Sequence, residues 1–216
     1  MFPRKPLTDH EHQFENPDEA RHYAEHMGKW NMVYNDFLKV LERNGVSGRV
    51  LEVGAGPGLL AARVARRFPD VHVTAFEISS AMADYGREYM KKRGLQERVE
   101  YVMGDANDPG VFQNLPKFDL VYCSYSLHHF GDTEKSIKNL LQAVADGGKL
   151  CIFDFRRVWW LYIMPFKDGF FNSLRASYKP DEMKELLERL NITSFEIKKL
   201  FPFLLSVTIP KQQTSI

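Results

Sequence analysis

The segment Glu52-Val53-Gly54-Ala55-Gly56-Pro57-Gly58 is the part of the sequence whose residue types most clearly predict chemistry. An apolar run, residues 49–53, leads into it, and Leu60, Val64 and Phe68 follow at the spacing of one helix face. Glycines between a strand and a helix let the backbone approach a ligand, and the N–H groups of the first helical turn point toward it. For the glycines alone, a tight turn without any ligand is the alternative interpretation.

Two acidic residues follow the next predicted strands and strengthen the prediction of a ligand. Glu77 comes directly after the run 71–76, 23 residues beyond Gly54, where a carboxylate can accept hydrogen bonds from both hydroxyls of a ribose. Asp105 follows the run 99–103, where it could accept from the amino group of an adenine. The carboxyl ends of parallel strands meet at one edge of a sheet, so these groups should lie together. They predict a site for an adenosine-containing ligand.

The spacing of the glycines and the position of Glu52 favour one kind of adenosine ligand over another. A pyrophosphate cofactor favours the pattern G-x-G-x-x-G, but here the third glycine is Gly58 and Leu59 follows it. The carboxylate of Glu52, just before the loop, would repel a pyrophosphate. It suits a ligand with an ammonium or sulfonium centre.

With these motifs the chain resembles the class I S-adenosylmethionine-dependent methyltransferases, most closely the small-molecule branch of the ubiquinone/menaquinone-biosynthesis type. The matching segments are VLEVGAGPG (50–58), FEISSAM (76–82), GDAND (104–108), FDLVYCSYSLHHF (118–130) and VADGGKLCIFDF (144–155). The resemblance covers residues 45–155 and the hairpin in the tail. It implies S-adenosylmethionine as cofactor, S-adenosylhomocysteine as product, and in-line transfer of a methyl group to a small-molecule acceptor.

The resemblance also implies roles for individual residues along the bound cofactor. Tyr23 would cap the cofactor, although a core aromatic is the alternative for it. The other implied contacts are Glu52, Gly54 and Gly56 at the methionine moiety, Cys123 and Ser124 at its ammonium, Glu77 at the ribose, Ile78 and Met82 against the adenine, and Asp105 and Ala106 at the adenine edge.

The segment after residues 118–123 holds the candidate catalytic residues. It has no Asn/Asp-Pro-Pro-Tyr run and no Pro-Cys nucleophile, which argues against methylation of exocyclic nitrogens or of pyrimidine C5 by those routes. Tyr125, His128 and His129 should face the mouth of the site. A histidine there could take a proton from a hydroxyl or thiol. Alternatively, one of the two histidines caps the following helix or packs beside the cofactor.

The aromatic stretch 154–166 is predicted to form an insertion after the fifth strand, and three interpretations of it stay open. It could be a substrate pocket, with Trp159 and Trp160 as its walls and Arg156 or Arg157 pairing with an anionic group. Residues 158–166 could instead form a surface for peripheral membrane contact or for a hydrophobic substrate. The third interpretation is a dimer patch or a cover for the core.

Composition excludes several other classes of protein. The 44% hydrophobic content excludes a disordered chain, and 29 basic against 28 acidic residues argue against nucleic-acid binding by bulk charge. His22 and His26 lie four residues apart, but no third ligand is evident, so no metal is predicted. Two cysteines, no signal peptide and no transmembrane stretch predict a soluble cytoplasmic protein, either monomer or homodimer. A non-catalytic binding module and an RNA or protein methyltransferase remain as alternatives.

The predicted elements form an α/β, Rossmann-like fold that would position these residues. Residues 1–17 read as a loose leader, and residues 18–44 as one helix. We expect residues 1–44 to be a leader and helical lid, and residues 45–216 to be a methyltransferase core with a lid insertion at about 156–178. The sheet should have seven strands in the order 3-2-1-4-5-7-6, mostly parallel with an antiparallel C-terminal strand and helices on both faces. The last strand is placed between the fifth and sixth because residues 203–209 are nearly all apolar, whereas 195–199 alternate as an exposed edge strand does.

Overall fold

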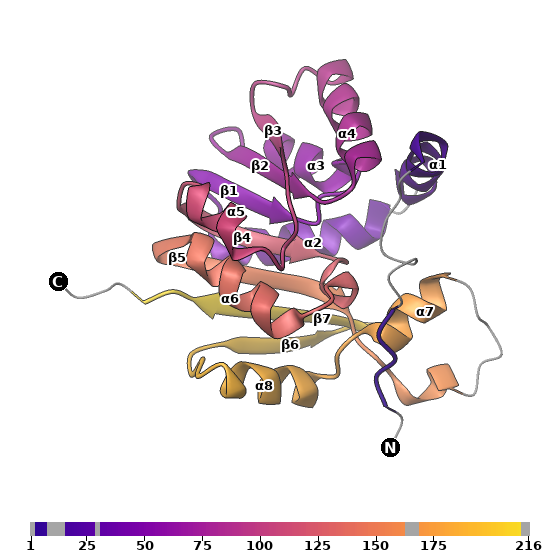
Figure 1. Cartoon of the computed structure of the whole chain (residues 1–216), viewed down its shortest axis with the longest axis vertical. Helices are drawn as coiled ribbons and strands as arrows, with labels where there is room; N and C mark the ends of the chain where they lie inside the picture. Colours follow the sequence, from indigo (N-terminus) through magenta and orange to yellow (C-terminus); the bar gives the residue numbers. More distant parts are fainter. Residues whose placement is uncertain (1–2, 8–15, 29–30, 163–168, 213–216) are drawn as a thin grey trace.

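A computed structural model describes residues 3–7, 16–28, 31–162 and 169–212. Its centre is one seven-stranded sheet in the order β3-β2-β1-β4-β5-β7-β6 (Figure 1). The strands are β1 (Arg49–Val53), β2 (His72–Glu77), β3 (Val99–Met103), β4 (Phe118–Ser124), β5 (Val144–Phe155), β6 (Glu196–Leu200) and β7 (Leu204–Pro210). Strands β1 to β5 pair in parallel, and β7 pairs antiparallel with both β5 and β6. The predicted fold class and strand order are confirmed.

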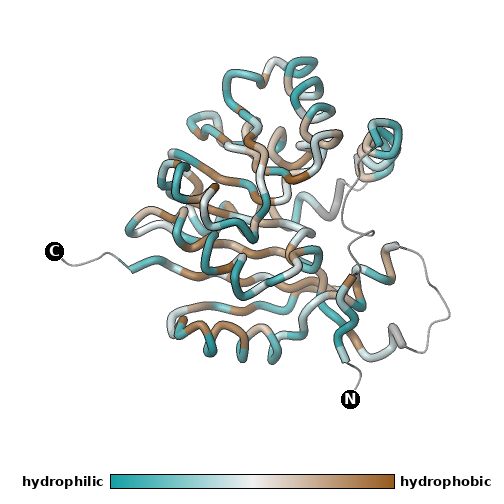
Figure 2. Tube along the Cα trace, viewed as in Figure 1, coloured by the Kyte–Doolittle hydropathy of each residue, from teal (hydrophilic) through white to brown (hydrophobic). Residues whose placement is uncertain are grey.

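Helices cover both faces of the sheet because neighbouring residues of each strand point to opposite sides. Val50 and Leu120 pack into the cluster under α2 (Asn31–Asn44), α3 (Leu59–Arg67) and α4 (Ser80–Lys92). Leu51 and Val121 pack on the other face, under α5 (Pro109–Asn114), α6 (Thr133–Ala143) and α8 (Pro180–Arg189). Apolar residues accordingly concentrate along the strands, and polar ones on the outer sides of the helices (Figure 2).

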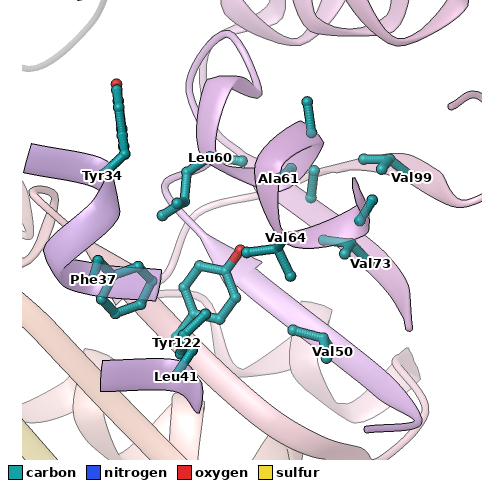
Figure 3. Packing of buried hydrophobic residues seen from close by; sticks show 14 of the residues in the cluster. Tyr34, Phe37, Leu41, Val50, Leu60, Ala61, Val64, Val73, Val99 and Tyr122 are labelled. Carbon is teal, nitrogen blue, oxygen red and sulfur yellow. The ribbon is translucent and has the colours of Figure 1, made fainter. Parts of the chain in front are cut away.

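The N-terminal helical region consists of two helices, so the prediction of one helix over 18–44 was wrong. Helix α1 (Pro17–Gly28) ends at a glycine, which is a poor helix former. It packs on α4, where Ala20 contacts the buried Met82. Helix α2 packs on the sheet instead, and the ring of Phe37 lies 5.1 Å from that of Tyr122 (Figure 3). The two helices therefore bury their apolar faces against different partners.

Strand β7 occupies the inner position predicted for it. Four of its residues from Leu204 to Val207 are buried, whereas β6 alternates between exposed and half-buried positions. A strand covered on both faces is mostly apolar, whereas an edge strand can expose every other side chain. This difference in pattern sets the order of the last two strands.

The insertion after β5 contains a short 3-10 helix, η3 (Trp159–Tyr162), and helix α7 (Gly169–Ala176), while residues 163–168 lie outside the described part of the chain. Arg157 is buried beneath it, where its guanidinium donates to the carbonyl of Ser177 at 2.7 Å and pairs with Glu182 of α8. Residues 3–7 lie beside α7 (Figure 1), and the N–H of Lys5 donates to the carbonyl of Arg175 at 3.1 Å. The prediction of a loose leader was therefore wrong for these residues.

Candidate functional site

A cavity of about 310 Å³ opens at the carboxyl ends of β1 to β4. Many of the residues predicted to contact a cofactor line it, and so do two of the three predicted catalytic residues. The complete lining is Tyr23, Val53, Gly54, Gly56, Phe76, Glu77, Ile78, Met82, Gly104, Asp105, Ala106, Asn107, Tyr125, Ser126, His129, Phe130 and Gly131. The structure thus brings together one residue of α1 and the ends of four strands that are far apart in the sequence.

The glycine loop has a backbone conformation that requires glycine at its key position. Gly54 has φ +73°, and a Cβ there would lie 2.6 Å from the Cβ of Ser126. The N–H groups of Gly54 and Ala55 both donate to the carbonyl of Phe76, at 2.9 and 3.1 Å. The loop is therefore tied to the end of β2 and presents its backbone to the cavity.

Glu77 is held at the end of β2 by three backbone donors. Its Oε2 accepts from the N–H of Gly56 at 2.7 Å, and its Oε1 accepts from those of Ile78 and Ser79 at 3.0 and 2.9 Å. Burial raises the pKa of Glu77, and the three N–H groups act in the opposite direction. Oε2 has accepted one hydrogen bond and a carboxylate oxygen has two lone pairs, so it retains capacity for a hydroxyl of a ligand.

The aromatic and acidic residues predicted around the adenosine part lie on both sides of the cavity. Tyr23 reaches it from α1, and burial, with the nearby Glu77, raises the pKa of Tyr23 to about 12, so it stays a neutral phenol. Ile78 lies just before α4, lines the cavity and is 42% exposed. Asp105 accepts from the N–H of Asn107 at 2.8 Å, which fixes the turn after β3.

Glu52 lies behind the glycine loop, outside the residues that line the cavity. Its Oε2 accepts from the hydroxyl of Tyr122 at 3.0 Å. Burial raises its pKa to about 8, and the nearby Glu77 adds to the rise, while donors from Tyr122 and the backbone of Ala61 act against it. Any contact of Glu52 with a ligand would therefore have to be indirect.

Cys123 and Ser124 occupy the end of β4 next to the cavity rather than its wall. Cys123 is fully buried, and burial raises the pKa of its thiol well above the usual range. Ser124 is half-buried and pairs with Phe153 in the sheet. Their side chains do not line the cavity among the described residues, so the backbone carbonyls remain their predicted contribution.

Tyr125 begins the acceptor side of the cavity in a strained backbone conformation. Its φ is +52°, which is uncommon outside glycine and clusters at functional sites. The N–H of Tyr125 donates to the carbonyl of Phe153 at 2.8 Å, and its ring lies 4.9 Å from that of Phe155. Burial raises the pKa of Tyr125, so its hydroxyl is a neutral donor or acceptor.

The two histidines of the short 3-10 helix η2 (Leu127–His129) have different environments. His129 lines the cavity, whereas His128 is buried and its Nδ1 lies 2.7 Å from Oδ1 of Asp154. The two imidazole rings are 4.2 Å apart. The sequence indicated both histidines but gave no sign that Asp154 would be the partner of one of them.

The residues predicted to bind substrate lie away from the cavity in this structure. Trp159 is 66% exposed, and the ring of Trp160 lies 6.3 Å from that of Phe203. The guanidinium of Arg156 donates to the carbonyl of Pro202 at 3.2 Å. The part of the insertion that could connect them to the cavity includes residues outside the described ranges.

Several lining residues were missed because they are apolar, glycine, or polar without a recognised motif. They are Val53, Phe76, Gly104, Asn107, Ser126, Phe130 and Gly131. Most of them end a strand or follow one within a few residues, so position after a strand was the signal that could have identified those. Ser126 is one example, since its hydroxyl donates to the carbonyl of Val53 at 3.1 Å and links the ends of β4 and β1.

Comparison with known proteins shows which family this part of the chain resembles. Residues 50–148 match the family model described as a methyltransferase domain. This segment, a little under half of the chain, is similar to that domain. The resemblance to class I S-adenosylmethionine-dependent methyltransferases of the ubiquinone/menaquinone-biosynthesis-like branch is confirmed.

Curated relatives and solved structures extend the comparison. A ubiquinone/menaquinone biosynthesis C-methyltransferase from Idiomarina loihiensis is 29% identical over 110 residues, which cover 50% of this chain and 43% of that protein. The chain thus matches less than half the length of that relative. A SAM-dependent methyltransferase from Aquifex aeolicus shares the fold with a TM-score of 0.70 at 19% identity, over 90% of this chain and 98% of that one. A plantazolicin methyltransferase solved with a triazolic desmethylPZN analogue and S-adenosylhomocysteine also shares the fold, with a TM-score of 0.71 at 16% identity over 91% of both chains.

The described residues carry neither a metal site nor a membrane span. Within them no group of three potential ligands from histidine, cysteine, aspartate or glutamate comes together. None of the helices in the described ranges is long and apolar enough to cross a membrane.

Proposed function

We propose that this protein transfers the methyl group of S-adenosylmethionine to a small-molecule acceptor by in-line displacement. The observation that carries the proposal is the carboxylate of Glu77, held by Gly56, Ile78 and Ser79 at the wall of the cavity that the glycine loop forms. This arrangement offers an acceptor to ribose hydroxyls beside a backbone that can approach the ligand closely. The match of residues 50–148 to a methyltransferase domain supports the same activity.

The chemistry of the cavity wall suits the parts of that cofactor. Tyr23, Ile78 and Met82 provide apolar surface for the adenine, and Asp105 with the backbone of Ala106 provides polar partners for its edge. Gly54 and Gly56 would adjoin the methionine moiety, with Glu52 acting from behind the loop and Cys123 and Ser124 through their carbonyls. Methyl transfer from a sulfonium needs close alignment and exclusion of water more than covalent participation of the protein.

The acceptor would enter beside Tyr125 and His129, on the side of the cavity away from Glu77. The cavity of about 310 Å³ lies at the small end of the range for ligand sites. The neighbour solved with a plantazolicin analogue supports a small-molecule acceptor here. Arg156, Trp159 and Trp160 would contact it only if the insertion around them moved toward the cavity.

Further aspects of this function follow from the arrangement of the elements. Residues 1–44 would act as a lid because α1 supplies Tyr23, and the segment 156–178 as a second cover above η2. Two buried free thiols, Cys123 and Cys151, favour a reducing, cytoplasmic location. The balanced charge favours neither RNA nor DNA as substrate. We further propose that residues 158–166 make peripheral contact with a membrane. We also propose that the protein is a monomer or a homodimer.

Calorimetric titration of the protein with S-adenosylhomocysteine tests the proposed function. We expect binding with a dissociation constant well below about 1 mM, which corresponds to roughly 4 kcal/mol. NAD serves as the control because it shares the adenosine but carries a pyrophosphate, which the spacing of the glycines does not favour. Binding of NAD without binding of S-adenosylhomocysteine would refute the proposal.

The competing function is a non-catalytic module that only binds a partner. The residues of the cavity favour a methyltransferase over such a module. A protein that only presents a surface to a partner has no need of a ribose-binding carboxylate or of glycine at a position where a Cβ would clash. Mass spectrometry of the purified protein should find the cofactor or its product bound. Turnover decides between the two functions, because release of S-adenosylhomocysteine requires an acceptor.

A further inference from the structure

The side chain of Asp154, at the end of β5, is organised entirely around His128 and its own backbone. Its Oδ1 lies 2.7 Å from Nδ1 of His128 and accepts from the N–H of Phe155 at 2.7 Å. Its Oδ2 accepts from the backbone N–H of His128 at 3.0 Å. The two side chains are only 1% and 6% exposed for His128 and Asp154. The carboxylate therefore holds both the ring and the main chain of one histidine.

This contact determines which nitrogen of His128 carries the proton in the neutral ring. An ionised carboxylate only accepts hydrogen bonds, so Nδ1 must be the donor to Asp154. Nε2 then bears the lone pair. It is buried and has no hydrogen-bond partner within the described part of the chain. Buried polar atoms are nearly always paired, so this lone pair remains available to accept a proton.

The ring of His128 lies directly behind a residue that lines the proposed acceptor site. The ring of His128 lies 4.2 Å from that of His129, which lines the cavity, and 5.7 Å from that of Phe155. Helix α7 of the insertion packs against η2, which carries both histidines. The acceptor side of the cavity and the underside of the insertion therefore meet at this pair of rings.

We propose that His128, oriented by Asp154, is the proton acceptor of the reaction and that the methyl acceptor carries a hydroxyl or thiol. This inference rests on the proposed function and names the chemical class of its substrate. Nε2 takes the proton of the O–H or S–H group, whose electron pair forms the new bond to the methyl carbon. The carbon–sulfur bond of the sulfonium breaks, and its electrons remain on the sulfur of the product. The proton on His128 then leaves to solvent.

In this proposal Asp154 is a positioning residue. It fixes the tautomer and the ring orientation, and it stabilises the imidazolium that forms when Nε2 is protonated. Because Nε2 is covered in this structure, the acceptor would reach it by displacing α7, the helix that packs against η2. A neutral amine acceptor would need no such base before attack, so the arrangement favours an oxygen or sulfur nucleophile.

The first test measures the tautomer of His128 directly in the whole protein. Two-bond nitrogen–proton NMR spectra of protein labelled with ¹⁵N-histidine, at neutral pH, should show a protonated Nδ1 and a bare Nε2. Asp154→Asn should alter that pattern, while the exposed His72 keeps its own. A proton on Nε2 in the wild type would overturn the proposal without any substrate.

The second test uses His128→Asn, which is designed to keep the fold. The side-chain amide of asparagine can donate to Oδ1 of Asp154 in place of Nδ1, but it has no equivalent of Nε2. The readout is release of S-adenosylhomocysteine with a set of phenols and aryl thiols of graded acidity. For weakly acidic phenols we expect a loss of about 10²- to 10⁴-fold in kcat, the usual contribution of a general base. His72→Gln is the matched control and should leave turnover unchanged.

The dependence on acceptor acidity separates a base from a structural role. The loss in His128→Asn should shrink for aryl thiols and acidic phenols, which are already ionised in solution and need no base. An equal loss for every acceptor, a loss of less than about twofold, or methylation of none of these acceptors would overturn the proposal. In each of these cases the wild type would still bind S-adenosylhomocysteine in the calorimeter. Failure of that binding would instead refute the proposed function itself.

Discussion

Replacement of Glu77 by glutamine tests the centre of the site with almost no change of shape. In the wild type Oε1 accepts two backbone N–H groups, and Oε2 accepts one from Gly56 at 2.7 Å. The amide of Glu77→Gln has a single oxygen, and it keeps more bonds if that oxygen takes the place of Oε1. Its NH₂ group then faces the N–H of Gly56, so a donor meets a donor in the buried wall of the cavity.

The expected magnitude follows from this geometry. One charge-assisted hydrogen bond is lost, worth about 1.5–3 kcal/mol, and one N–H is left without an acceptor. Together these effects should lower the free energy of unfolding by about 2–4 kcal/mol. The ribose also loses its acceptor at Oε2, so the dissociation constant for S-adenosylhomocysteine should rise by about 10- to 100-fold, or about 1.4–2.7 kcal/mol.

Two measurements on the same sample check this prediction. Urea unfolding at neutral pH gives the stability, and calorimetry gives the affinity for S-adenosylhomocysteine. Glu97→Gln is the matched control, because Glu97 is exposed on the loop before β3 and the same charge is removed. If Glu77→Gln bound S-adenosylhomocysteine as tightly as the Glu97→Gln control, the assignment of Glu77 to the ribose would be wrong.

Three further predictions address the surroundings of the site. Burial raises the pKa of Glu52 from 4.5 to about 8, so the stability that its protonated form contributes is full below pH 4.5 and lost as the pH rises through about 8. The free energy of unfolding in urea, measured from pH 5 to 9, should show this loss in the wild type but not in Glu52→Gln. The same pH dependence in both proteins would contradict the raised pKa of Glu52. Gly54→Ala should abolish cofactor binding and cost several times the roughly 1 kcal/mol expected for Gly45→Ala, since both have positive φ but only Gly54 has a side chain in the way. Equal unfolding free energies for the two variants would argue against that clash. Arg157→Ala should cost about 3 kcal/mol by breaking a buried ion pair, against less than about 1 kcal/mol for Arg156→Ala. Thermal unfolding measures the stability of the two variants. A larger loss for Arg156→Ala than for Arg157→Ala would show that Arg157 is not the more important of the two arginines for stability.

Much of the fold was predictable because its determinants are local in the sequence. The apolar runs 49–53, 71–76 and 99–103 predicted β1, β2 and β3 to within one residue. Ser79 and Asp132 cap their helices by accepting from Met82 and Lys135, as short polar side chains before an apolar helix face do. The order of the last two strands followed from which of them was apolar on both faces.

The cofactor side of the site was predictable for a related reason. In a parallel sheet, the residue after each strand arrives at the same edge, so Gly54, Glu77 and Asp105 meet there whatever the helices between them contain. The division of residues 18–44 into α1 and α2 was not predictable in this way. It depends on α1 finding a surface on α4 and α2 finding one on the sheet, although both have similar periodicity.

The sequence by itself determined the strand order, the glycine loop and the acidic residues at the strand ends, since periodicity and position after a strand are local properties. Only the tertiary structure decided which buried polar groups meet. Asp154 and His128 are 26 residues apart, and Arg157 and Glu182 are 25 apart. The protonation of Glu52 likewise depends on how completely its neighbours exclude water. Such pairings require the packing of side chains from separate elements, and no spacing along the chain encodes them.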